Sequence, residues 1–319
     1  MHLEKTLENS AAILTEGAVI ERLHRDTAVE LDPFIAHAGL IYDETGKKIL
    51  KTIYRQYIDI GLRHNLPIIV SAPTWRANPE RINTSVFQEH RTMNQDCVRL
   101  MTEIRKDYAG YSENIYIGGL MACRGDAYRP AEALSQAAAK EFHTPQAHAL
   151  ADAGVDFIMA ATLPAVSEAL GMAAAIADCG IGYCLSFVIK KNGAVLDGTP
   201  LHKAIEKIDS AMDPKPLFYM VNCVHPEVFR QGIGQEIEKS EFIKNRLIGF
   251  QANTSSKSPE ELDGLDYLDT SDPAEFAESM LSLHNQFGIQ VLGGCCGTDN
   301  RHIEEIAKHI NNCYAGKGE

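Results

Sequence analysis

The segment ALADAGVDFIMAATLPAVSEALGMAAAIADCG, residues 149–180, decides the fold class because it holds helix and strand signals in direct succession. Its apolar run VDFIMA (155–160) is short and apolar on both faces, as expected of a buried parallel strand. An Ala-rich helix is predicted before it over 130–153, and a second helix follows over 164–179. This order of elements indicates an α/β protein.

The same alternation recurs along the whole chain. Seven further apolar runs are predicted to be strands: 11–15, 66–71, 114–120, 181–189, 216–222, 246–252 and 288–294. Helical spacing of apolar residues is found over 49–60, 87–104, 199–211, 273–286 and 300–313. Eight strands alternating with helices predict a (β/α)8 TIM barrel that forms one domain over 1–319, with an open doubly wound sheet as the alternative. No GxGxxG or Walker A sequence supports a nucleotide-binding fold.

Composition excludes several classes of function. The 319 residues include 30 basic and 43 acidic side chains, and the net charge of −13 disfavours binding to nucleic acid or anionic membranes. The N-terminus lacks the order of a signal peptide, and no apolar run reaches the roughly 18 residues of a membrane span. We therefore expect a cytoplasmic protein whose eight cysteines are reduced thiols.

Polar residues follow several predicted strands, where a TIM barrel carries its chemistry. Glu16 follows the first strand, and Trp75 lies in the loop after the second. Cys223 ends the sixth strand, whereas Cys295 and Cys296 end the eighth. The three cysteines are thus expected to face the same mouth of the barrel.

The adjacent cysteines allow three interpretations. A vicinal disulfide would be strained and is disfavoured in the cytoplasm, whereas two small core residues at a tight turn would fit the pattern. The third interpretation is a metal site, which requires the chain to leave strand geometry between Cys295 and Cys296 because strand neighbours point to opposite faces. Gly293, Gly294 and Gly297 supply backbone freedom for this bend. Three thiolates with one open position describe a catalytic zinc site.

The dipeptide Asn222-Cys223 together with GGCCGT (293–298) resembles the homocysteine S-methyltransferase family of zinc-dependent barrels. Four more stretches match it: TEGAVIERL (15–23), PTWRANPERI (73–82), GDAYRPAEALSQAAAKEFHTPQAHALADAGVDFI (125–158) and LSFVIKKNGAVLDGTPL (185–201). The resemblance implies that Cys223, Cys295 and Cys296 hold Zn²⁺, and that a thiol such as homocysteine is the fourth ligand and accepts a methyl group. It also implies a role in methionine biosynthesis.

The chain departs from the family pattern at two positions. The first strand of the family usually ends in Asp-Gly, whereas this chain has Glu16-Gly17. After the fourth strand the family typically has Glu-Thr, and its Glu grips the amino group of homocysteine; here Ala161 precedes Thr162. Because a charge-assisted hydrogen bond contributes roughly 1.5–3 kcal/mol, we expect another thiol acceptor, or homocysteine held through Glu16 alone. The predicted substrate-binding residues are Glu16, Gly17, Trp75, Thr162, Asn222 and Asn253.

The methyl donor is expected to be a free small molecule or a separate protein, because the chain ends shortly after its eighth strand and helix. The resemblance implies a sulfonium or quaternary ammonium donor, such as S-methylmethionine, S-adenosylmethionine or betaine. The face of Trp75 would attract such a cation, or would cap the barrel mouth or a subunit contact. A corrinoid-linked demethylase and a non-catalytic zinc barrel are the alternatives, and the sequence leaves a homo-oligomer open. His143, His148 and His225 are expected to be surface or capping residues.

Overall fold

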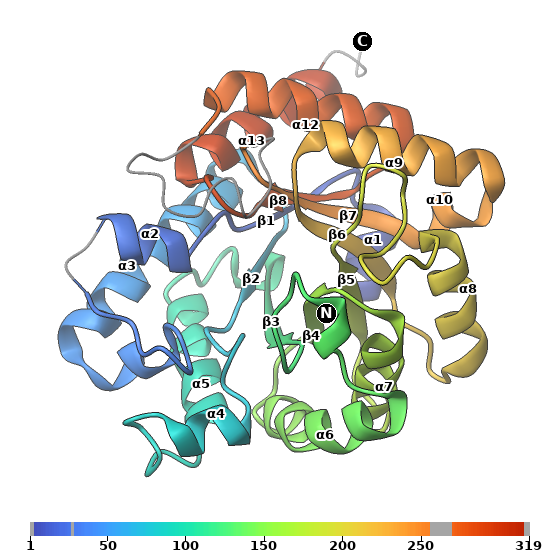
Figure 1. Cartoon of the computed structure of the whole chain (residues 1–319). Helices are drawn as coiled ribbons and strands as arrows, with labels where there is room; N and C mark the ends of the chain where they lie inside the picture. The colour runs from blue at the N-terminus through green and yellow to red at the C-terminus, as the bar shows by residue number, and fades with distance from the viewer. Residues whose placement is uncertain (1–2, 27–28, 256–269, 316–319) are drawn as a thin grey trace.

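Eight parallel strands form a closed barrel in the computed structural model, which describes residues 3–26, 29–255 and 270–315 (Figure 1). The strands are β1 Ile13–Thr15, β2 Ile68–Ser71, β3 Ile115–Ala122, β4 Phe157–Leu163, β5 Tyr183–Phe187, β6 Phe218–Val224, β7 Leu247–Ala252 and β8 Val291–Gly294. Each strand pairs with the next, and β1 also pairs with β8, with Ile13 opposite Val291. The predicted TIM barrel is confirmed, and the open sheet is wrong.

Helices surround the barrel in Figure 1. They are α1 Leu3–Asn9, α2 Ile20–Asp26, α3 Glu44–His64, α4 Pro79–Thr84, α5 Met93–Lys106, α6 Gln136–Asp152, α7 Val166–Ala177, α8 Leu201–Ala211, α9 Pro226–Lys239, α10 Phe242–Arg246, α12 Pro273–Phe287 and α13 Asn300–Ala315. Short 3₁₀ helices lie at η1 Ala38–Tyr42, η2 Ser112–Asn114 and η3 Pro130–Glu132. None of these helices is long and apolar enough to cross a membrane.

The helices differ from the sequence prediction in several places. The short helices α1, α2, α4 and α10 were not predicted, nor was α9 between β6 and β7, which begins with Pro226 at its first turn and is capped by His225. The helix predicted from residue 87 begins at Met93, because the Phe87 ring packs against Gly39 and stacks on Tyr42. The helix predicted from residue 130 begins at Gln136, after a short 3₁₀ helix.

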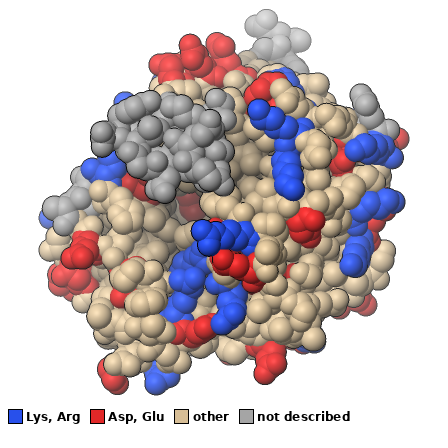
Figure 2. Space-filling model, viewed as in Figure 1, with Lys and Arg blue, Asp and Glu red and all other residues tan. Residues whose placement is uncertain are grey.

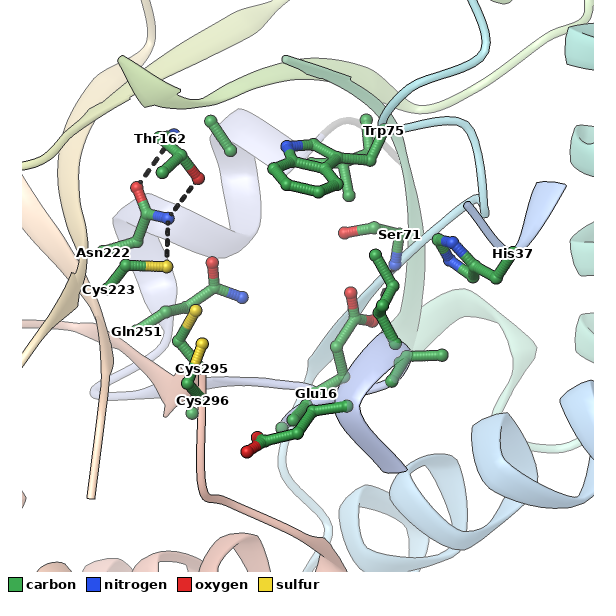
Figure 3. Close-up of a pocket in the computed structure, with 18 of the residues that line it drawn as sticks. Glu16, His37, Ser71, Trp75, Thr162, Asn222, Cys223, Gln251, Cys295 and Cys296 are labelled. Atoms are coloured by element: carbon green, nitrogen blue, oxygen red, sulfur yellow. Dashed lines mark hydrogen bonds between the residues drawn. The ribbon is translucent and has the colours of Figure 1, made fainter. Parts of the chain in front are cut away.

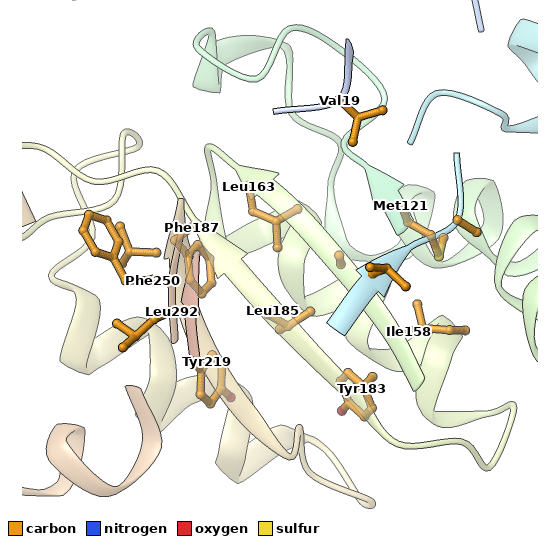
Figure 4. Packing of buried hydrophobic residues seen from close by; sticks show 14 of the residues in the cluster. Val19, Met121, Ile158, Leu163, Tyr183, Leu185, Phe187, Tyr219, Phe250 and Leu292 are labelled. Carbon is orange, nitrogen blue, oxygen red and sulfur yellow. The ribbon is translucent and has the colours of Figure 1, made fainter. Parts of the chain in front are cut away.

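Apolar side chains form two layers of core. The outer layer lies between the strands and the helices, and Figure 4 shows several of its members: Leu163, Leu185, Phe187, Tyr219, Phe250 and Leu292. The inner layer fills the barrel and includes Ile13, Phe157 and Phe218. Leu3 of α1 belongs to this inner layer, and the hydroxyl groups of Thr6 and Tyr116 are hydrogen-bonded. Helix α1 therefore closes the N-terminal end of the barrel and leaves the C-terminal end for a site.

Candidate metal and substrate site

Three cysteine thiols meet at the C-terminal end of the barrel (Figure 3). The sulfur atoms of Cys223, Cys295 and Cys296 all lie within 4.8 Å of one another. Across residues 3–26, 29–255 and 270–315, no other group of three His, Cys, Asp or Glu side chains is gathered this closely. Zinc binds thiolates at about 2.3 Å in tetrahedral geometry, which places its sulfur ligands about 3.8 Å apart. The cluster therefore fits one zinc-sized ion.

The backbone at the ends of β4 and β6 is strained where it approaches this cluster. Cys223 has a φ of 56° and Thr162 a φ of 60°, both in the left-handed region that residues with a Cβ rarely adopt. At Asn222–Val224 the pairing of β6 with β7 also shifts register. Such strain costs on the order of 1–3 kcal/mol per residue and is concentrated at functional sites. It turns the Cys223 thiol out of the regular pleat.

The turn after β8 is held by strand β7 and the residues that follow it. The Cys295 N–H donates to the carbonyl of Ala252 at 2.7 Å, and the Cys296 N–H donates to the Asn253 side-chain oxygen at 3.1 Å. Gly297 has a φ of 82°, so a glycine is favoured there. These bonds direct two adjacent thiols toward one point.

Gly293 and Gly294 are required for close packing, not for the backbone freedom expected from the sequence. Neither residue has a positive φ. A Cβ on Gly293 would lie 1.8 Å from the Thr15 hydroxyl, and a Cβ on Gly294 would lie 2.3 Å from the Thr298 hydroxyl. Glycine at these two positions lets β8 approach β1 and lets the turn after β8 fold back onto the strand.

Hydrogen bonds make one of the three sulfurs a thiolate acceptor. Donation from the Cys295 and Cys296 thiols, from Tyr128 and from Asn222 holds the pKa of Cys223 well below its ordinary value, despite burial. The hydrogen bond that the Cys295 thiol donates to Cys223 raises the pKa of Cys295 well above its ordinary range. A cation placed among the three sulfurs would displace the remaining thiol protons, because metals bind the thiolate form.

The amide of Asn222 connects β4, β5 and β6 beneath the thiols. Its Nδ2 donates to the Thr162 hydroxyl at 2.8 Å and to the Cys223 sulfur at 3.3 Å. Its Oδ1 accepts from the Thr162 N–H at 3.0 Å and from the Ser186 hydroxyl at 2.7 Å. Because both ends of the amide are satisfied, its orientation and that of the Cys223 side chain are fixed.

A loop from β3 brings a phenol to the thiols. Tyr128 donates a hydrogen bond to Cys223, and the charge of that sulfur, with burial, raises the pKa of the phenol. The buried carboxylate of Glu168 holds the loop at both ends: one oxygen accepts from the Arg124 N–H at 2.7 Å, and the other from the Leu134 N–H at 3.2 Å. His143 donates to the same carboxylate at 2.9 Å.

The thiols open into a cavity of about 410 Å³. Figure 3 shows the thiols, Asn222 and Gln251 on one side of it and Glu16, Ser71 and His37 on the other. We refer to the first side as the thiol wall and to the second, together with Trp75, as the opposite wall. The molecular face in Figure 2 is hollowed near its middle, and basic side chains lie along one edge of the hollow.

Glu16 is the acidic group of the opposite wall. Its carboxyl accepts a hydrogen bond from the Ser71 N–H at 2.7 Å. Burial raises its pKa to about 8, although this hydrogen bond opposes the shift. Glu16 is therefore protonated at neutral pH in the empty cavity, and a cation bound beside it would favour the ionised form.

The comparisons with known proteins agree with this geometry. The sequence profile described as Homocysteine S-methyltransferase matches residues 13–310. The chain belongs to the homocysteine S-methyltransferase family. It is 26% identical to homocysteine S-methyltransferase YbgG of Bacillus subtilis over 96% of each chain. It is 22% identical to homocysteine S-methyltransferase 2 of Arabidopsis thaliana over 93% of this chain and 92% of that one.

Solved structures of this family share the fold. The metallated form of the homocysteine methyltransferase MmuM from Escherichia coli superposes with a TM-score of 0.73 at 18% identity, covering 96% of this chain and 99% of that one. Its oxidized form gives a TM-score of 0.76 at 19% identity over the same shares. As a member of the family, the protein is a methyltransferase that acts on small molecules.

The structure brings five of the six predicted substrate-binding residues to the cavity: Glu16, Gly17, Trp75, Thr162 and Asn222. Asn253 does not line the cavity, because its side-chain oxygen is directed to the Cys296 N–H. Ala161, which replaces the acidic residue typical of the family, lies in the wall beside Thr162. No other carboxylate takes over that position among the described residues lining the cavity, where Glu16 and Glu21 are the acidic members.

Several residues of the site were not predicted from the sequence, among them Tyr128, Glu168, His37, Ser71 and Gln251. The stretch from Gly125 carried the family resemblance, and it contains Tyr128. His143, predicted to be a surface or capping residue, is fully buried because it is bonded to Glu168; that prediction was wrong. His148 is exposed and His225 caps α9, as predicted.

Proposed function

We propose that this protein is a zinc-dependent S-methyltransferase in which Cys223, Cys295 and Cys296 hold the metal and an acceptor thiol occupies the open fourth position. The observation that supports this most directly is the mutual approach of the three sulfurs within 4.8 Å at the end of a cavity large enough for two small molecules. Bound zinc supplies one property to the reaction: it keeps a coordinated thiol deprotonated at neutral pH.

The residues of the chain place and protect the reacting sulfur. Asn222 and Tyr128 donate hydrogen bonds to Cys223 and orient it, while the strained backbone at Thr162 and Cys223 holds the thiol wall in one geometry. The acceptor sulfur attacks the methyl carbon of the donor, and a new C–S bond forms. The methyl–sulfur or methyl–nitrogen bond of the donor breaks, its electron pair leaves with the neutral thioether or amine, and the acceptor's proton is released to solvent.

A small sulfonium or quaternary ammonium compound is the proposed methyl donor. Trp75 supports this class because its aromatic ring lines the cavity, and such rings attract onium cations. The Arg76 guanidinium lies 4.3 Å from the centre of the same ring, so one face of the tryptophan already engages a cation. S-methylmethionine and betaine are therefore the first donors to test.

The test is to measure zinc in the purified protein and to follow methylthioether formation from homocysteine and other thiols by mass spectrometry. We expect stoichiometric zinc and methyl transfer from at least one donor. Cys295→Ser should lose both, whereas Cys179→Ser, a cysteine that lies outside the cluster and does not line the cavity, should lose neither. If Cys295→Ser retains zinc and turnover, the proposal is wrong.

A further inference from the structure

Four histidines are buried in the described part of the chain, and one of them differs from the rest. His143 is bonded to Glu168 at 2.9 Å, His202 to Glu236 at 2.6 Å and His302 to Asp299 at 3.0 Å. Buried ring nitrogens normally have such partners. His37 alone of the four has no carboxylate partner among the described residues; its Nδ1, like that of His143, has no hydrogen bond there. Its ring lines the cavity instead.

The local backbone is built to place this ring. The Asp32 carboxylate accepts hydrogen bonds from the N–H groups of Phe34 and Ile35 at 2.8 and 3.0 Å, which closes a tight turn. Ala36 then adopts a φ of 53° before the chain enters η1 at Ala38. A left-handed alanine costs on the order of 1–2 kcal/mol, so the position of His37 is imposed by the turn and not by local preference.

The neighbours of His37 on the opposite wall are also incompletely bonded. The Ser71 hydroxyl faces Glu16 but lies outside hydrogen-bond geometry, and the Trp75 indole N–H has no partner in the described chain. Figure 3 shows Ser71 between His37 and the centre of the cavity. Each unpaired buried polar group costs about 1–3 kcal/mol, and a ligand that supplied hydrogen bonds to it would remove that cost.

The opposite wall carries little charge. No lysine or arginine is among the described residues that line the cavity. Burial lowers the pKa of His37 to about 3, so its imidazole is neutral, and the raised pKa of Glu16 keeps that carboxyl protonated at neutral pH. An anionic group bound here would meet no lysine or arginine, and a cationic group would gain a counter-ion only by ionising Glu16. An uncharged hydrogen-bonding group would pair with the wall directly.

We propose that His37 and Ser71 bind an uncharged hydrogen-bonding group, a hydroxyl or a carboxamide, at the end of the acceptor thiol that lies away from the sulfur. The inference rests on the proposed methyl transfer and specifies its acceptor as a neutral polar thiol. Ala161 agrees with this class, because it offers no carboxylate where the family has one, and Glu21, the other acidic residue that lines the described cavity, already accepts a hydrogen bond from the Gly297 N–H.

The test uses zinc-loaded protein and a panel of ω-mercaptoalcohols of increasing length. Alkanethiols, aminothiols and mercaptocarboxylic acids of the same lengths, and homocysteine, complete the panel. Binding is measured by titration calorimetry without donor, and kcat/KM is measured with the donor that the protein accepts. We expect the best mercaptoalcohol to bind about tenfold more tightly than its charged counterparts, the effect of roughly one hydrogen bond.

Substitution of His37 tests whether this residue carries the preference. His37→Phe should weaken the mercaptoalcohol by about tenfold, mainly through KM, and leave the alkanethiol unchanged. His37→Asn, which keeps a hydrogen-bonding atom near the Nδ1 position, should restore most of the preference. Equal loss for alcohol and alkanethiol would indicate a merely structural role and overturn the proposal.

Two further results would also contradict the inference and would be distinguishable from failure of the proposed function. Tightest binding of homocysteine, unaffected by His37→Phe, would show that the acceptor is a zwitterion held elsewhere. If His37→Phe changed only the KM of the donor, His37 would bind the methyl donor and not the acceptor. Calorimetry reports on the subsite even if no thiol is methylated, whereas absence of methyl transfer to every thiol would reject the proposed function.

Discussion

The two walls of the cavity are built in opposite ways. On the thiol wall every polar side chain that supports the sulfurs is bonded: the Asn222 amide makes four hydrogen bonds, and Asn253 and Tyr128 each bond to the cysteine cluster. On the opposite wall, His37 Nδ1 and Trp75 Nε1 have no partner among the described residues. A fully bonded network fixes geometry in advance, whereas unsatisfied groups can be completed by a ligand. The thiol wall is therefore pre-organised, whereas the opposite wall is suited to recognise a ligand.

The largest expected effect is a loss of stability when Glu168, whose carboxylate holds the Tyr128 loop, is removed. Glu168→Ala leaves the buried His143 and two partly buried backbone N–H groups without their acceptor, which should lower the free energy of unfolding by about 3–5 kcal/mol. Burial raises the pKa of Glu168, but these hydrogen bonds outweigh it and lower the pKa below its ordinary value, so the lost group is an ionised acceptor. Chemical denaturation at neutral pH measures the change.

A matched control separates stability from activity. Glu236→Ala removes another fully buried carboxylate bonded to a histidine, but one that does not line or support the cavity. It should be destabilised similarly. At a temperature where both variants are folded, Glu168→Ala should lose kcat through the displaced Tyr128 loop, and Glu236→Ala should not. Equal kcat in the two variants would show that the loop does not position the thiol wall.

A smaller effect is expected within the thiol wall itself. Asn222→Ala removes the amide that orients Cys223 and should weaken zinc binding or kcat by about 10–100-fold, as is typical for residues that support metal ligands. Competition with a chromophoric chelator measures the metal affinity. Ser186→Ala removes only one bond to the same amide and should cost less. The role assigned to Asn222 would be refuted if Asn222→Ala kept both the zinc affinity and the kcat of the parent protein.

On the opposite wall we expect a pH dependence, which is the smallest effect when it is compared over a single pH unit. The pKa of Glu16 is near 4.5 in the unfolded chain, and burial raises it to about 8 in the folded protein. Between these values the folded protein holds a proton that the unfolded chain has released, so the free energy of unfolding falls as the pH rises. Relative to Glu16→Gln, the parent protein should therefore lose about 1.4 kcal/mol of unfolding free energy per pH unit across this window. Denaturation of both zinc-loaded proteins at pH 5.5, 6.5 and 7.5 measures it. A difference independent of pH would show that Glu16 is ionised in the folded state.

The thiol wall was largely predictable from the sequence, and the opposite wall was not. Strand periodicity located β6 and β8, and the rule that parallel strands end on one side of a barrel then brought Cys223, Cys295 and Cys296 together. Asn222 was found because it precedes a strand-end cysteine. His37 and Tyr128 lie on long connecting segments, where no periodicity reports which way a side chain points. His143 and Glu168 lie 25 positions apart in the chain, on two different helices. The sequence around each of them looks like that of a solvent-exposed helical residue, so the pair could not be predicted.

Helix α1 has a consequence for where the two substrates of the proposed reaction would meet. Because its Leu3 packs in the inner core at the N-terminal end of the barrel, the described cavity lies at the C-terminal end, beside the three cysteines. The proposed acceptor and donor would then have to occupy this one cavity together. Steady-state kinetics should accordingly show a complex of the enzyme with both substrates and not a ping-pong pattern. A barrel closed at one end thus brings both partners of a direct transfer to the same place.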